Sequence, residues 1–176
     1  YLGQTILNKN SEAGTWKLEY VQLYDESGNT NQLSKNDLDE LGIRTTFEVT
    51  GGIADTTAPT LVSYELSSYE IDLSQGDYVI DVQARITDDI SGVSDGQYSS
   101  GVFRGTSQAR WRSPSGNQFL DAGYFTQPSS GTYLDGIYLG QTILNKNSEA
   151  GTWKLEYVQL YDESGNTNQL SKNDLD

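Results

Sequence analysis

The sequence predicts an all-β fold, an antiparallel β-sandwich, and three observations support this. Residues 77–87 alternate apolar and polar side chains, as a strand with one buried face requires. The 176-residue chain is rich in glycine (18) and tyrosine (12), and short apolar segments are separated by Gly, Ser, Asn and Pro at the spacing of sandwich strands. The 35% of hydrophobic residues can fill a core. Eight or nine strands per unit are expected.

The chain contains an internal repeat. Tyr1–Asp39 is identical to Tyr138–Asp176, an offset of 138 − 1 = 137 residues. Such duplication is typical of tandem repeat proteins. We therefore predict tandem 137-residue repeats, with residues 1–54 the C-terminal part of one repeat and residues 55–176 the following repeat lacking its last strand.

The first copy begins with two expected strands. Tyr1–Asn8 is predicted as one strand, and Thr15–Tyr24 as a central strand, since apolar and polar residues alternate along its first half. At Val21 the apolar phase slips by one position, which predicts a bulge. The tryptophan of this strand, Trp16, and its second copy, Trp153, are expected in the core.

A short helix is predicted before the closing strand of the repeat. Ser34 and Asp37 have capping-box spacing, and Gly42 is suited to end the helix. Thr45–Thr50 alternates and is expected to be the closing strand. The following segment, Gly51–Pro59, has the composition of a linker, so a new domain is expected from Asp55.

The second domain is expected to contain further strands separated by turns. An initial strand is interrupted at Ser67 and Ser68. The predicted segments are residues 61–66, 69–73, 77–87, 102–104, 109–112, 118–125 and 137–144.

Composition limits the chemistry. The formal net charge of −14 argues against nucleic acid and anionic membranes as partners and favours cations. The chain has no Cys and no His, so hard cations such as calcium suit it better than zinc or copper. No apolar run approaches ~18 residues, so no membrane insertion is expected. Without an initiating Met, the chain is interpreted as an internal piece of a longer protein.

Three short motifs carry a family resemblance. Residues 55–61 (DTTAPTL), the strand end 86–89 (ITDD) and the loop 23–29 (LYDESGN) resemble bacterial immunoglobulin-like repeats, including cadherin-like ones, of large secreted or cell-surface proteins. The resemblance implies an immunoglobulin-like sandwich in stalks, adhesin extenders or matrix fibres, sometimes rigidified by calcium, and no enzyme activity. The unit is longer than the ~100 residues usual for such sandwiches.

Acidic residues are predicted to gather at one pole of the second domain. In an antiparallel sandwich, the start of the first strand and the ends of the second and penultimate strands share a pole. Converging carboxylates repel unless a cation lies between them, so calcium is the expected ligand, and solvated turn residues are the alternative. The candidate ligands are Asp55, Asp88, Asp89, Asp95, Asp162 and Glu163.

Other interpretations remain open. Trp111, Tyr98 and Tyr124 form an aromatic platform for glycans in one of them, and belong to the core or cover a sheet face in the other. An amide bond between an Asn and Lys9, Lys17 or Lys35 is a further alternative. No carboxylate pair has a spacing that singles it out for glycoside hydrolysis.

The favoured function is a structural repeat of an extracellular or cell-surface array: a bacterial stalk, adhesin extender or biofilm-matrix fibre. A carbohydrate-binding module of a secreted polysaccharide-active protein is the alternative. Each end of the chain is interpreted as an incomplete domain, and a missing edge strand is a template for strand addition. The expected partners are neighbouring repeats, through strand complementation in trans, or glycans.

Overall fold

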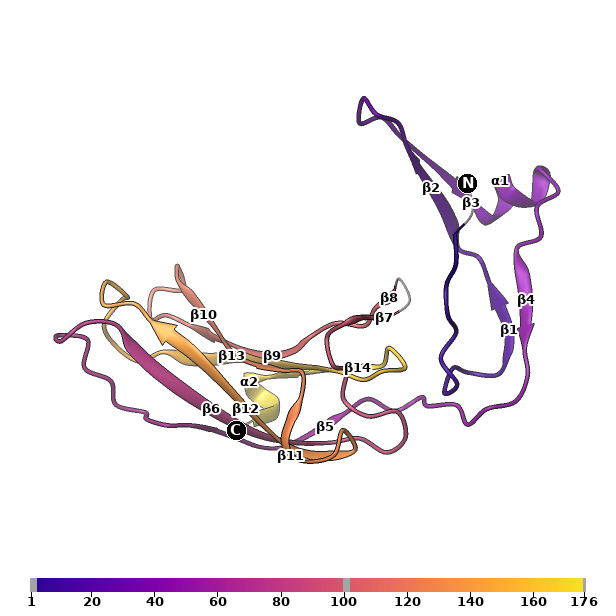
Figure 1. Ribbon diagram of the computed structural model, residues 1–176. Coiled ribbons are helices and arrows are strands. Elements are labelled where there is room, and N and C mark those ends of the chain that lie inside the picture. Colours follow the sequence, from indigo (N-terminus) through magenta and orange to yellow (C-terminus); the bar gives the residue numbers. More distant parts are fainter. Residues whose placement is uncertain (1–2, 100–101, 176) are drawn as a thin grey trace. The chain divides into compact units, whose positions relative to one another are not determined.

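The computed structural model describes residues 3–99 and 102–175, which divide into two compact units (Figure 1). Ser11–Ala54 form the smaller unit, and Asp55–Asp176, together with the segment before Ser11, form the larger. The larger unit thus resumes at Asp55, where the sequence predicts a domain to begin. The segment before Ser11 groups with the larger unit, whereas the sequence assigns it to the preceding repeat.

Two four-stranded antiparallel sheets build the larger unit. One has the order β10-β9-β13-β14, formed by Phe119–Phe125, Ser107–Arg112, Lys154–Tyr161 and Thr167–Ser171. The other has the order β11-β12-β6-β5, formed by Pro128–Gly131, Asp135–Leu144, Tyr78–Thr87 and Thr60–Leu66. Its remaining described elements are β7 (Tyr98–Ser99), β8 (Val102–Phe103) and the short helix α2 (Lys172–Leu175). The predicted all-β, sandwich-like character is confirmed.

The core lies between these two sheets. Strand β6 buries every second residue, with Ile80, Val82, Ala84 and Ile86 at most 3% exposed. The opposite sheet contributes Ala109, Ala122, Phe125, Val158 and Leu160. Both inner faces therefore show the period of two that the sequence predicts for residues 77–87.

The central strand β13 contains a bulge. Its register with β9 shifts between Leu155 and Tyr157, which leaves Glu156 as the extra residue. After the bulge, Val158 and Leu160 face the core and are 0% exposed. The sequence places the bulge at Val21, equivalent to Val158, so the predicted position is two residues too late.

The sheets approach closely at a pair of glycines. A Cβ atom built at Gly140 in β12 would lie 2.7 Å from the Cα atom of Gly123 in β10. Real Cβ atoms essentially never come this close to backbone, so the contact requires glycine at position 140. Gly123 also has φ of 75°, in the left-handed region, at the register shift of β10.

The smaller unit consists of two ribbons and a helix. Strand β1 (Gly14–Lys17) pairs with β4 (Thr46–Val49), and β2 (Tyr20–Tyr24) pairs with β3 (Thr30–Ser34). Helix α1 (Lys35–Glu40) follows Ser34, whose backbone N–H donates to Asp37 Oδ2 at 2.8 Å in a complete capping box. The predicted helix and its cap are confirmed.

Three further expectations are wrong. Residues 3–8 form no strand, although the same sequence lies in β12, because only β12 has a partner, β6, along its whole length. Residues 69–73 also form no strand, and their apolar side chains pack at the edge of the core instead. Trp153 is partly buried against the core as expected, but Trp16 is 39% exposed because no second sheet covers its ribbon.

Candidate functional site

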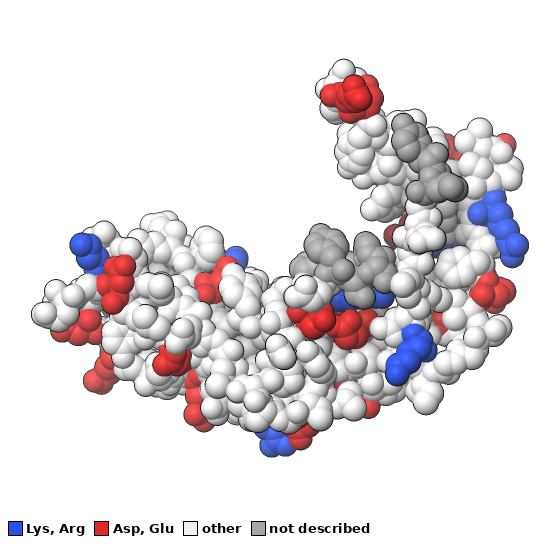
Figure 2. Space-filling view, in the orientation of Figure 1, with Lys and Arg blue, Asp and Glu red and all other residues white. Residues whose placement is uncertain are grey.

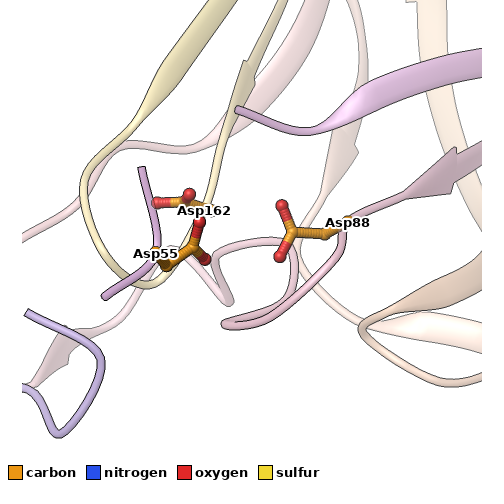
Figure 3. Close-up of side chains that lie close together, drawn as sticks. All are labelled: Asp55, Asp88 and Asp162. Carbon is orange, nitrogen blue, oxygen red and sulfur yellow. The ribbon is translucent and has the colours of Figure 1, made fainter. Parts of the chain in front are cut away.

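Three aspartates from separate segments converge at one pole of the larger unit (Figure 3). Asp55 precedes β5, Asp88 directly follows β6, and Asp162 directly follows β13. Antiparallel pairing brings the start of β5 to the end of β6, so the topology places these residues together. Each offers a carboxylate oxygen, and these oxygens all lie within 4.8 Å of one another.

The three carboxylates lie in a largely buried site. Asp55 is 4% exposed, Asp162 is 0% exposed and Asp88 is intermediate. Backbone N–H groups hold them: Ser91 donates to Asp55 Oδ2 at 2.8 Å, and Gly92 donates to Asp88 Oδ2 at 2.7 Å. Such donors stabilise ionised carboxylates.

The Asp162 turn adds an amide that links two of the acids. The backbone N–H groups of Gly165 and Asn166 donate to Asp162 Oδ1 at 2.6 and 2.8 Å. The Asn166 Nδ2 group donates to Asp162 Oδ2 at 2.7 Å and to the Asp55 backbone oxygen at 3.1 Å. Sequence reasoning did not single out Asn166, although the DESGN turn that holds it is rich in turn formers and oxygen ligands.

One carboxylate oxygen has no hydrogen-bond partner. Asp88 Oδ1 is buried and accepts no hydrogen bond, and the hydroxyl groups of Ser91 and Ser164 are also buried and unpaired. A buried polar atom without a partner is costly unless an unseen ligand satisfies it. The orphaned oxygen at the triad therefore fits a site for a cation or water.

Electrostatics at the triad favour a positive ligand. Burial raises the pKa of Asp88 and that of Asp162 above their usual range, and the neighbouring charge of Asp55 raises both further. Hydrogen bonds from the turns oppose this rise. A bound cation would relieve the repulsion and the desolvation cost together. Carboxylate, amide and hydroxyl oxygens are ligands that calcium prefers.

The other three predicted ligands lie outside this triad. Asp89 is exposed and accepts a short hydrogen bond from the Thr57 hydroxyl. Asp95 and Glu163 contact each other, with the Asp95 backbone N–H donating to Glu163 Oε1 at 2.8 Å. The prediction of an acidic pole thus includes a compact triad, and the three other acids have contacts of their own.

The surface charge is dispersed. Figure 2 shows Asp and Glu side chains at several separate places on the face in view, with fewer Lys and Arg. Several acids are paired across strands, including Asp121 with Arg110 and Glu156 with Arg112. Among the described residues, the triad is the group of acids that could hold a metal ion.

The predicted aromatic platform is only partly described. Trp111 in β9 is partly buried, and its Nε1 group donates to the Tyr64 hydroxyl on the opposite sheet at 3.1 Å. Tyr124 in β10 is 55% exposed, while the next residue, Phe125, is buried, so Tyr124 faces away from the core. Tyr98 lies in β7, but its side chain falls outside the described part of the chain. Trp111 and Tyr124 therefore do not share one flat face.

The comparisons with known proteins leave the family open. No protein-family model, no curated protein sequence and no solved structure matches the chain. The fold defines the class as an all-β, sandwich-like protein. Within the described residues, no helix has the length and apolar character needed to cross a membrane.

Proposed function

We propose that the chain is a structural repeat of an extracellular surface array, with an immunoglobulin-like sandwich as its unit and calcium as a stabilising ligand. The observation that carries this proposal is the letter-perfect return of 39 residues after 137 positions. Catalysis gains nothing from an identical second copy, whereas a stalk or fibre gains length with each copy.

The acidic triad supports the calcium part of the proposal. Asp55 directly follows the segment joining the two units, so a cation held by Asp55, Asp88 and Asp162 would tie the end of that segment to the ends of β6 and β13. Such a tie would restrict the segment at its exit from the sandwich. A role in stiffening a repeat array is consistent with this position.

Calcium titration of the intact chain tests the site. A ligand at 100 times its Kd that binds only the folded state stabilises it by about 2.7 kcal/mol. For a protein of this size, each kcal/mol raises Tm by roughly 2–4 °C. We expect calcium to raise Tm of the wild-type chain and the chelator EGTA to reverse the effect.

Two neighbouring substitutions separate the site from general charge effects. Asp88→Asn should abolish the calcium-dependent rise in Tm and leave Tm in EGTA unchanged or higher, because it removes one of three repelling charges. Asp89→Asn removes the same charge one position further along, at an exposed residue, and should keep the calcium response. An unchanged wild-type Tm on calcium addition would refute the calcium proposal.

The alternative function is a carbohydrate-binding module, and one observation favours it. Trp111 and Trp153 both line an open groove of about 800 Å³ in the larger unit. Aromatic side chains in grooves stack on sugar rings. Glycan-array binding that is lost in Trp111→Ala would support the module. Elongated small-angle scattering of tandem repeats without glycan binding would support the structural repeat.

A further inference from the structure

The groove lined by Trp153 lies beside a strand edge without a partner. Apolar side chains from both sheets line it, including Leu66, Ile80, Trp111 and Leu144. At this end of β13, Lys154 pairs with Arg112 of β9. No strand pairs with residues 151–153 on either side within the described part of the chain. The backbone there can accept an additional strand.

The first copy of the same sequence shows which strand fits this edge. Gly14, Thr15 and Trp16 are the counterparts of residues 151–153. They pair in register with Val49, Glu48 and Phe47 of β4, and the rings of Trp16 and Phe47 stack with centroids 6.0 Å apart. The chain therefore already contains a strand complementary to this edge.

The edge at Trp153 already has the conformation that receives β4. Trp16 Nε1 donates to the backbone oxygen of Glu12 at 2.9 Å, and Trp153 Nε1 donates to that of Glu149 at 2.9 Å. The preceding glycines are also alike, with φ of 127° at Gly14 and 124° at Gly151. The second copy thus needs no local rearrangement of this turn to accept the strand.

The groove offers β4 a better apolar environment than its own ribbon. In the β1–β4 ribbon, Phe47 remains 51% exposed and Trp16 39% exposed, even though their rings stack. Trp153 instead packs against the core of the sandwich. A phenylalanine placed on Trp153 would be covered by the groove walls, and burial of aromatic surface favours the exchange.

We propose that β4 of a second copy of this chain adds to the edge at residues 151–154, with Phe47 seated in the groove against Trp153. The register repeats that of β1: Val49 opposite Gly151, Glu48 opposite Thr152, Phe47 opposite Trp153 and Thr46 opposite Lys154. This inference rests on the proposed structural repeat. Donor and acceptor surfaces differ, so the contact is head-to-tail and continues into a fibre.

A mixture of two single-cysteine variants tests the register in trans. The chain has no native Cys, so Glu48→Cys in one preparation and Thr152→Cys in another supply one thiol each. These positions lie opposite each other in the proposed pairing, within reach of a disulfide. Mild oxidation of the mixture should link the two chains, with the bond located by mass spectrometry of the linked peptides. Glu40→Cys, exposed and outside β4, is the control partner for Thr152→Cys and should link far less.

A matched pair of apolar truncations tests the anchor. Phe47→Ala, introduced into the Glu48→Cys chain, should lower the yield of linked chains by at least about tenfold, the effect expected when one buried anchor is lost. Leu23→Ala in the same chain removes a side chain that is also 51% exposed but lies in β2, and should leave the yield unchanged. Equal yields for the two truncations would overturn the assignment of Phe47.

A third variant separates the possible occupants of the groove. Appending a copy of residues 40–54 after Asp176 gives the second copy its own β4 sequence. This segment should fill the groove from within the chain and abolish linking in trans. Linking that persists in the extended chain would refute the groove as the acceptor, as would binding of glycans there with no linking. If linking fails but calcium still raises Tm through Asp88, the strand inference fails and the calcium part of the proposed function stands.

Discussion

Residues 140–175 repeat the sequence of residues 3–38, yet the two copies lie in different surroundings. In the second copy, this sequence continues into β12 and β13 of a two-sheet unit, and Leu160 is 0% exposed. In the first copy it forms two-stranded ribbons, and the equivalent Leu23 is 51% exposed. Since the sequences are identical, every difference comes from the neighbouring strands.

Features that the two copies share are set locally. Ser34 caps α1 through Asp37, and Ser171 makes the same contacts with Asp174 before α2. Both tryptophans bond the backbone carbonyl group four residues earlier. These contacts span at most four residues, so short segments of sequence determine them.

The largest expected difference between the copies concerns the buried leucine. Leu160→Ala should lower the free energy of unfolding by about 2–5 kcal/mol, because it opens a cavity in the core. Leu23→Ala should cost less than about 1 kcal/mol, since half of that side chain is already in water. Urea unfolding followed by circular dichroism measures both. Similar losses for the two variants would show that the first copy has a core of its own.

A smaller difference is expected at the paired glycines. Gly140→Ala would place a Cβ atom 2.7 Å from the backbone of Gly123 and should destabilise the larger unit by about 1–3 kcal/mol. Gly3→Ala changes the equivalent residue, whose added Cβ would have no neighbour within 4 Å. We expect no measurable change in its unfolding midpoint. A destabilising Gly3→Ala would place the first copy in a paired strand.

The smallest effect, and the sharpest in sign, concerns one aspartate in both copies. A hydrogen bond from the Asn29 side chain lowers the pKa of Asp25, which is exposed, whereas burial and the charge of Asp55 raise the pKa of Asp162. Stability from Asp25 is present above its ordinary pKa near 3.8 and is lost as pH falls. Stability linked to Asp162 is present below the ordinary value and is lost as pH rises through the raised pKa.

Carboxyl carbon NMR shifts followed against pH in EGTA measure this contrast. Spectra of Asp25→Asn and Asp162→Asn assign the two signals. We expect the midpoints to lie on opposite sides of the ordinary aspartate value, and calcium to shift only that of Asp162, downward. Two midpoints on the same side would mean that the triad does not form in solution.

The sequence predicts what depends on periodicity and local capping. The buried face of β6, the cap at Ser34 and the start of a unit at Asp55 all follow from such patterns. Strand parity also brings Asp55, Asp88 and Asp162 to one pole. The triad could not be separated from Asp89, Asp95 and Glu163 by sequence, because side-chain direction at a strand end depends on the turn geometry. The failed strand at residues 3–8 has a similar cause, since pairing requires a neighbour that its own sequence does not encode.

The unpaired ribbon of the first copy has a consequence for how the chain folds. Residues 17–24 and 154–161 have the same sequence, so either can pair with β9 in an unfolded chain. Chain connectivity decides between them: β13 follows β12 after nine residues, whereas the first copy must close a loop of more than 80 residues to reach β9. The near copy should form the sheet first, and molecules that pair the far copy should refold through a slow phase. Substituting Val21 and Leu23 with Thr in the first copy would remove the competing strand, and with it that slow phase.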